Sequence, residues 1–167
     1  MFERHEGEEL LDIDPSAMPK DAGVVFIGKV CSPWTRREDC PKNMRAARET
    51  GSKAQVLVAS AYRPGLRGLE RTSHVIVLTW LHHSPRNLIV QKPRHADESK
   101  GVFALRSPVR PNPVGVHVAK LLSLDIEKGE LQLEAIDVLD GTPVIDLKPY
   151  LASVDSIADA TVVRSDG

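Results

Sequence analysis

Short apolar segments rich in β-branched residues recur along the chain, and turns that contain glycine or proline separate them. β-branched side chains pack well on a pleated strand, and many short strands between such turns are typical of an antiparallel β-barrel. We therefore predict a mainly β fold, a small antiparallel β-barrel with short helical turns in its loops. The predicted strands are residues 24–31, 54–59, 73–82, 87–90, 102–105, 114–126 and 130–138, and the predicted helical turns lie within 43–51 and after Pro149.

The sequence lacks the marks of several other protein classes. It has no alternation of strands with long helices and no Gly-x-Gly-x-x-Gly motif, which argues against a doubly wound nucleotide-binding fold. No apolar stretch approaches the roughly 20 residues that cross a bilayer, and the acidic start is unlike a signal peptide. Cys31 and Cys40 fit no common zinc spacing, and we predict a reduced, cytoplasmic protein.

A chain of 167 residues suits one domain with one hydrophobic core. The first 22 residues are acidic, contain Pro15 and Pro19, and offer few large apolar side chains. We expect a flexible N-terminal arm at residues 1–22, the barrel domain at residues 23–157, and a short tail at residues 158–167.

The net charge of −1 conceals a strong separation of charge along the chain. Residues 1–21 carry two Lys or Arg against seven acids, residues 22–120 carry seventeen against six, and residues 121–167 carry three against ten. A basic middle segment suits a polyanionic partner such as RNA. Acidic strands that neutralise basic loops within one fold would give the same counts, so the charge pattern leaves both interpretations open.

Four ordered segments carry a resemblance to a known family. They are VFIGKVCSPW at residues 25–34, GLERTSHVIVLTWLH at 68–82, GVFALRSPVRPNPVG at 101–115 and DVLDGTPVIDLKPY at 137–150. Together they resemble the TsaA-like (YaeB, TrmO) family of S-adenosylmethionine-dependent tRNA methyltransferases, over about residues 24–155. The resemblance implies a small β-barrel, S-adenosylmethionine as cofactor, tRNA as partner and a homodimer.

The resemblance also implies where the cofactor binds. Arg106 matches an arginine at the family's cofactor site, and His82 matches a histidine near the cofactor, with His83 as a second candidate. Alternation along the predicted strand would turn these two histidines to opposite sides. Lys42 and Asn43 depart from a Pro-Arg-Gln-like family element, a difference that would alter side-chain contacts and preserve backbone contacts. The full set expected at the cofactor is Lys42, Asn43, Met44, His82, His83, Arg106, Val116, Asp140, Gly141, Thr142 and Pro143.

Candidate substrate contacts come from the same motifs and, for Arg94, from the basic middle of the chain. An arginine can bind phosphate by a bidentate contact and a tyrosine can stack on a base, so the expected contacts with substrate are Arg94, Arg110, Asn112, Lys148 and Tyr150. Asn112 alternatively caps a proline-rich turn. Asp140 and Asp146 are candidate general bases on chemical grounds alone, because methyl transfer to a nitrogen releases a proton. The four histidines His82, His83, His95 and His117 have no recognisable metal spacing, and we predict no metal site.

The leading hypothesis is methylation of the exocyclic amine of threonylcarbamoyl-adenosine beside the tRNA anticodon, as the resemblance implies. An anticodon loop offers single-stranded bases that a protein can splay out and stack. Two alternatives stay open: a methyltransferase of a small molecule or other substrate, and a non-catalytic module that binds the cofactor or RNA. Product formation separates the last from the two enzymes, and salt-dependent tRNA binding separates the enzymes from each other.

Overall fold

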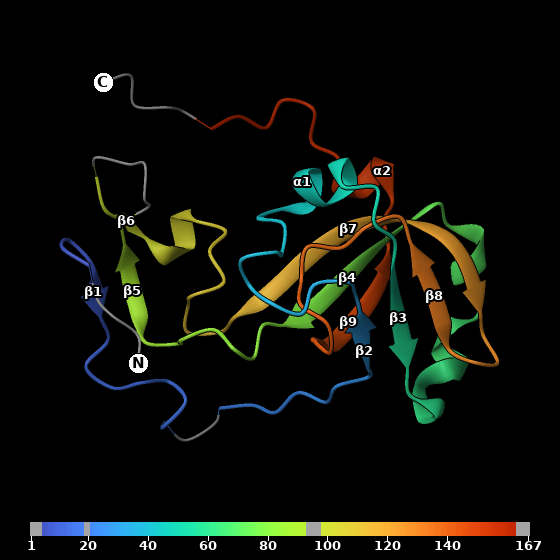
Figure 1. Ribbon diagram of the computed structural model, residues 1–167, viewed down its shortest axis with the longest axis horizontal. Helices are drawn as coiled ribbons and strands as arrows, with labels where there is room; N and C mark the ends of the chain where they lie inside the picture. The colour runs from blue at the N-terminus through green and yellow to red at the C-terminus, as the bar shows by residue number, and fades with distance from the viewer. Residues whose placement is uncertain (1–4, 19–20, 93–97, 163–167) are drawn as a thin grey trace.

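The structure is a computed structural model that describes residues 5–18, 21–92 and 98–162. Six antiparallel strands close a barrel in the order β2-β3-β8-β7-β4-β9 (Figure 1). Strand β9 pairs with β2 as well as with β4, and the pairing of Gly28 with Val144 closes the ring. The barrel strands are β2 (Gly28–Cys31), β3 (Ala54–Val58), β4 (His74–Trp80), β7 (Val114–Asp125), β8 (Glu130–Leu133) and β9 (Pro143–Pro149). The predicted fold class is confirmed.

Alternation along the strands fills the barrel interior. Strand β4 buries every second residue, Val75, Val77 and Thr79, and β7 buries Gly115 and His117 in the same way. Burial of an aliphatic side chain contributes about 1.5–3 kcal/mol, so inward valines such as Val75 and Val77 stabilise the barrel. The further core residues with no exposed surface are Val30, Val56, Ala119, Leu131, Leu133 and Val144.

A second, three-stranded sheet lies beside the barrel, at the left of Figure 1. It consists of β1 (Glu9–Leu10), β5 (Leu88–Gln91) and β6 (Lys100–Gly101). Leu10 pairs with Leu88, so the segment predicted as a flexible arm supplies a short strand. The backbone groups at the edge of β5 favour this pairing, because each unpaired donor or acceptor can bond to an incoming strand.

Short helices connect the strands. They are α1 (Met44–Glu49), η1 (Ser60–Leu66), η2 (Leu69–Arg71), η3 (Val102–Ala104) and α2 (Ala152–Asp155), where η marks a 3₁₀ turn. The helical turns predicted within residues 43–51 and after Pro149 are confirmed by α1 and α2. Among the helices of the described ranges, none has the length and apolar character that crossing a membrane requires.

The strand predicted at residues 102–105 is wrong. Val102 instead begins the 3₁₀ turn η3 and is fully buried. The guanidinium of Arg110 donates to the carbonyls of Val102 (2.7 Å) and Leu105 (3.2 Å). In a strand, these two carbonyls would instead accept from the backbone of a neighbouring strand. Arg106 therefore lies on an irregular loop after η3, not at the end of a strand.

Two other predicted strands are shorter than expected. Strand β2 begins at Gly28, four residues after the predicted start, and β8 ends at Leu133, five residues before the predicted end. Beyond β8, the Trp34 indole N–H donates to the carbonyl of Ile136 and the Ser32 hydroxyl donates to that of Val138, both at 2.8 Å. Side-chain donors thus replace a strand ladder here, because they satisfy the same backbone acceptors.

Candidate functional site

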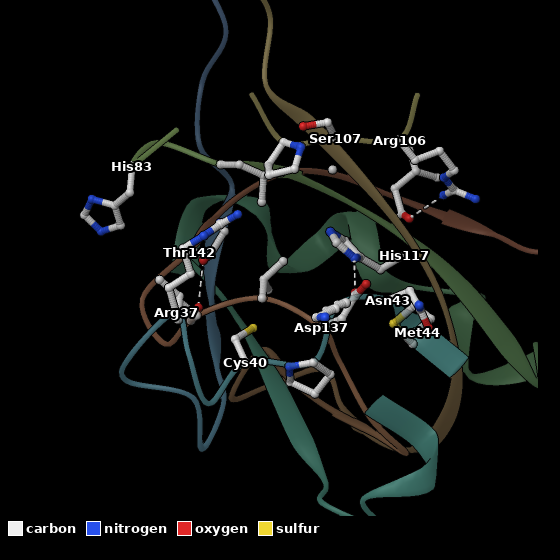
Figure 2. Close-up of a pocket in the computed structure, with 18 of the residues that line it drawn as sticks. Arg37, Cys40, Asn43, Met44, His83, Arg106, Ser107, His117, Asp137 and Thr142 are labelled. Carbon is white, nitrogen blue, oxygen red and sulfur yellow. Dashed lines mark hydrogen bonds and ion pairs between the residues drawn. The ribbon is translucent and has the colours of Figure 1, made fainter. Parts of the chain in front are cut away.

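A cavity of about 950 Å³ opens at one end of the barrel (Figure 2). Five segments that are distant in sequence line it: the loop before α1, the turn after β4, the loop after η3, the first residues of β7, and the irregular segment after β8. Such a concave site, assembled from loops on a rigid scaffold, is the usual form of a small-molecule pocket.

Most of the expected cofactor residues line this cavity. The lining includes Lys42, Asn43, Met44, His82, His83, Arg106, Val116 and Thr142, and also Arg110 from the expected substrate contacts. The lining does not include Asp140, Gly141, Pro143, Asp146, Asn112, Lys148 or Tyr150. Arg94 lies outside the described residues. Motif residues from separate segments therefore converge on one cavity.

The two arginines of the loop after η3 differ in their surroundings. One guanidinium nitrogen of the exposed Arg106 donates to the carbonyl of Val116 at 3.2 Å, which holds the side chain along β7. Its other donors remain available for an anion, and a guanidinium suits a carboxylate or phosphate. One guanidinium nitrogen of Arg110, Nη2, donates to the carbonyls of both Val102 and Leu105, so this side chain also shapes the loop.

Asn112 belongs to a separate cluster beside this loop. Its side-chain oxygen accepts from Arg86 at 3.2 Å, and Arg86 also donates to the carbonyl of Pro111 at 2.6 Å. The Arg86 guanidinium lies 5.4 Å from the ring centre of Trp80, within the range of a cation–π contact. This cluster ties the proline-rich loop to the end of β4.

His82 and His83 follow the end of β4 instead of continuing it. Their rings lie against each other, tilted by 42° with a centroid separation of 3.8 Å, so the prediction that they face opposite sides is wrong. A turn after Trp80 removes the strand alternation on which that prediction relied. Burial, and then the neighbouring His83, lower the pKa of His82, so near neutral pH its ring is uncharged and can stack or accept a hydrogen bond.

The side chain of Asn43 has a structural contact. It caps α1, where its oxygen accepts from the backbone N–H of Ala46 at 2.9 Å. Met44 then begins the helix and presents its thioether side chain to the cavity. Figure 2 shows both residues on the same side of the site.

The two carboxylates expected to act as bases lie elsewhere. Asp140 is exposed and its Oδ1 accepts from the backbone N–H of Ser32 at 3.1 Å, which fixes a turn. Asp146 pairs with Lys148 at 3.0 Å on the surface of β9. Tyr150 packs edge-on against His74, with ring centres 6.4 Å apart. These contacts account for the side chains without reference to the cavity.

Sequence reasoning missed the polar pair at the floor of the cavity. His117 Nδ1 bonds to Asp137 Oδ1 at 2.6 Å, and His117 Nε2 bonds to the hydroxyl of Thr79 at 2.9 Å. The side chains of His117 and Asp137 are only 6% and 15% exposed. The signal was present in the alternation of β7, which places a titratable residue at an inward position, and in a single aspartate within the apolar segment 135–139.

The lining chemistry fits S-adenosylmethionine. Guanidinium and ammonium groups from Arg37, Lys42 and Arg106 suit a carboxylate, and Glu38 suits an ammonium. Apolar side chains suit an adenine ring, and they come from Met44, Leu81, Val116, Val138 and Leu139. Within the described part of the chain, no group of three or more His, Cys, Asp or Glu side chains could hold a metal ion.

Cys40 offers a chemical probe of the cavity. Burial, and then the negative charge of Asp137, raise the pKa of the Cys40 thiol to about 11. Because the thiolate is the reactive form, we expect the alkylation rate of Cys40 by iodoacetamide to keep rising up to about pH 11. The rate is measured by mass spectrometry in Cys31→Ser protein, which leaves one thiol. A rate that levels off near pH 9, the ordinary thiol range, would contradict this placement.

Comparison with known proteins gives three informative matches. The tRNA-methyltransferase O N-terminal domain matches residues 29–156. A probable S-adenosyl-L-methionine-binding protein of Methanothermobacter thermautotrophicus is 41% identical over 132 residues, which are 78% of this chain and 91% of that protein. The tRNA (adenine(37)-N6)-methyltransferase of Escherichia coli K12 is 32% identical over 141 residues, which are 81% of this chain and 60% of that protein.

A solved structure agrees with the sequence matches. The crystal structure of TrmO from Pseudomonas aeruginosa superposes with a TM-score of 0.68 at 31% identity, over 85% of this chain and 62% of the other. The chain thus spans most of the archaeal relative and about three fifths of the two longer proteins.

Proposed function

The chain belongs to the family of the tRNA-methyltransferase O N-terminal domain, and from this premise we propose that it is an S-adenosylmethionine-dependent methyltransferase that acts on tRNA. The observation that carries the proposal is the cavity, in which five segments that are distant in sequence meet around a mixed charged and apolar lining. The bound cofactor supplies a methyl group already activated by its sulfonium. The protein's task is therefore to bind, to orient the acceptor nitrogen and to accept its proton.

The proposed acceptor is the exocyclic nitrogen of threonylcarbamoyl-adenosine beside the anticodon, in the cytoplasm. The relative from E. coli carries the name of an adenine(37)-N6 methyltransferase, which supports adenine at the acceptor position. Arg37, Lys42 and Arg106 at the cavity form a basic approach for RNA phosphates or for the threonyl carboxylate. Arg110, Lys148 and Tyr150 stay proposed as substrate contacts, and each also has a partner within the protein.

A methyl-transfer assay tests the proposal. Purified protein is incubated with labelled S-adenosylmethionine and with tRNA from cells that lack the methylated nucleoside. Labelled nucleoside released from the tRNA, identified by mass spectrometry, supports the proposal. Cofactor binding without methylated product would favour a binding module, which the name of the archaeal relative also fits. Methylation of a small molecule and not of tRNA would favour the remaining alternative.

The proposal includes a homodimer. Strand β7 leaves Val114, Val116 and Leu122 exposed, and the first two lie at the rim of the cavity. Exposed apolar side chains on one strand suit a surface that a second copy covers. Light scattering of the protein at micromolar concentration measures the mass, with twice 18.3 kDa as the expected result. A mass of 18.3 kDa at every concentration would remove the dimer from the proposal.

Loss of Arg106 should weaken cofactor binding. Arg106→Ala removes the exposed guanidinium that β7 holds at the cavity, so we expect the Kd for S-adenosylhomocysteine to rise more than tenfold, by the loss of one charge-assisted contact. Calorimetric titration measures it. Arg45→Ala is the matched control, since Arg45 pairs with Glu49 on the exposed face of α1 and is not among the cavity residues. An unchanged Kd in Arg106→Ala would remove Arg106 from the site.

A further inference from the structure

We propose that Asp137 accepts the proton of the acceptor nitrogen during methyl transfer, and that His117, backed by Thr79, positions its carboxylate. This inference rests on the proposed function and names a base that the sequence motifs did not identify. It depends on three features of the structure: the rigid backbone around Asp137, the polar chain behind it, and the absence of a competing carboxylate with the same placement among the described residues.

The backbone on both sides of Asp137 is held by side chains of another segment. The Trp34 indole N–H donates to the carbonyl of Ile136, and the Ser32 hydroxyl donates to the carbonyl of Val138, each at 2.8 Å. The backbone N–H of Asp140 then donates to the carbonyl of Trp34 at 2.8 Å. These bonds fix an irregular segment that no strand ladder supports. The carboxylate of Asp137 is therefore held in one place before any ligand binds.

Behind Asp137, a chain of polar groups leads into the barrel. Oδ1 of Asp137 bonds to Nδ1 of His117, and Nε2 of His117 bonds to the hydroxyl of Thr79, which is fully buried (Figure 2 shows the first pair). A carboxylate oxygen can only accept, so Nδ1 carries the hydrogen. A hydroxyl can donate or accept, so Thr79 can match either charge state of the ring.

Asp137 lines the cavity, and its contact with His117 uses one of the two carboxylate oxygens. That contact uses Oδ1, and no partner for Oδ2 is found among residues 5–18, 21–92 and 98–162. The apolar side chains of Met44 and Val138 line the same cavity. One oxygen is thus anchored inward, and the other is available to a ligand.

The chemistry of the acceptor requires such a group. The exocyclic nitrogen of threonylcarbamoyl-adenosine bears one hydrogen, and its lone pair is delocalised into the purine ring and the carbamoyl carbonyl. As the N–CH₃ bond forms, the S–CH₃ bond breaks with its electron pair kept on sulfur, and the proton of the nitrogen passes to Oδ2 of Asp137. After product release the proton leaves to water, which restores the carboxylate.

Other titratable groups nearby are placed less well. Asp140 and Asp146 lie outside the cavity lining and have structural partners. Glu38 lines the cavity but is exposed, so nothing fixes its carboxylate. Cys40 stays a protonated thiol at neutral pH, because its pKa is raised to about 11. Asp137 alone in this set combines burial, an anchored oxygen and access to the cavity.

The test compares Asp137→Asn with wild type in single-turnover methyl transfer to tRNA and in calorimetric binding of S-adenosylhomocysteine. We expect the transfer rate to fall at least a hundredfold while the Kd changes less than threefold. Asp159→Asn, which removes an exposed carboxylate of the C-terminal segment, is the matched control. A rate within threefold of wild type overturns the proposal. A Kd that rises in parallel with the loss of rate also overturns it, because Asp137 would then hold the cofactor.

A second pair of variants tests the positioning role of His117. His117→Asn keeps an N–H donor near the place of Nδ1, whereas His117→Leu has none. We expect the Asn variant to transfer methyl groups at least tenfold faster than the Leu variant, at equal cofactor affinity. Equal rates would mean that His117 only packs, and would overturn the proposal that it positions the Asp137 carboxylate. In ¹⁵N-labelled wild type, NMR of the free protein should detect the proton on His117 Nδ1, and Asp137→Asn should shift it.

The two levels of proposal fail in different ways. Wild-type protein that binds S-adenosylhomocysteine but transfers no methyl group to tRNA overturns the proposed function and the catalytic role together. Active wild type with an active Asp137→Asn variant overturns only the role of Asp137.

Discussion

Gly28→Ala is expected to lower the free energy of unfolding by about 3 kcal/mol, at the upper end of the cost of overpacking. A Cβ at this position would lie 2.1 Å from the carbonyl oxygen of Leu57 and 3.0 Å from the Cα of Val58, both backbone atoms of β3. Neither can move freely, because β2 is paired with β3 on one side and with β9 on the other. Urea denaturation followed by tryptophan fluorescence measures the loss.

Gly65→Ala is the matched control for this substitution. Gly65 lies in η1, and a Cβ there would meet nothing within 4 Å. Its free energy of unfolding should stay within about 0.5 kcal/mol of wild type. Equal stability of the two variants would show that β2 and β3 can separate at Gly28, and that the ring closes less tightly than the structure has it.

Gly115→Ala should abolish most methyl transfer and also destabilise the fold. Gly115 lies opposite Thr79 in the β4–β7 pairing, and the missing side chain leaves room for the His117 ring. A Cβ would lie 2.4 Å from the Thr79 hydroxyl oxygen and 2.5 Å from His117 Nε2. The bond between these buried groups would break, and each unsatisfied group costs about 1–3 kcal/mol. We expect the single-turnover rate to fall at least a hundredfold.

A double variant separates the clash from other effects of Gly115→Ala. Adding Thr79→Ala removes the hydroxyl that the new methyl group would strike, so part of the lost stability should return. Urea denaturation of the two single variants and the double variant gives the coupling free energy, which should exceed about 0.5 kcal/mol for residues in contact. Additive losses would mean that the extra methyl group and Thr79 do not meet.

The barrel could be predicted from the sequence because its strands are short, β-branched and separated by clear turns. The closing contact between Gly28 and Val144 could not, since strand pairing over that distance leaves no local pattern. The 3₁₀ turn at Val102 was missed for a different reason. Its apolar residues resemble a strand, and only Arg110, eight residues later, determines that their carbonyls bond to a side chain.

Some residues of the candidate site could likewise be predicted from the sequence, and others could not. Residues on recognisable motifs, such as Lys42, His82 and Arg106, converge on the cavity as expected from the resemblance. The pair of His117 and Asp137 was missed because one lies on a regular strand and the other on an irregular segment. Their contact depends on the register of β7 and on two bonds from Ser32 and Trp34. Such contacts arise from packing, which motif spacing does not encode.

The closed ring of six strands has a consequence for motion. A closed ring has no edge strand from which its ladder can open, so amide protons in the middle of its strands should exchange with solvent only when the barrel opens. The small sheet has strands of two residues at both edges, β1 and β6, and its amides should exchange through local openings. The loop that carries Arg106 follows β6 and η3 directly. The cavity therefore lies between barrel strands with slowly exchanging amides and a small sheet with rapidly exchanging amides. The loop that carries Arg106 can rearrange while the barrel beside Asp137 stays intact.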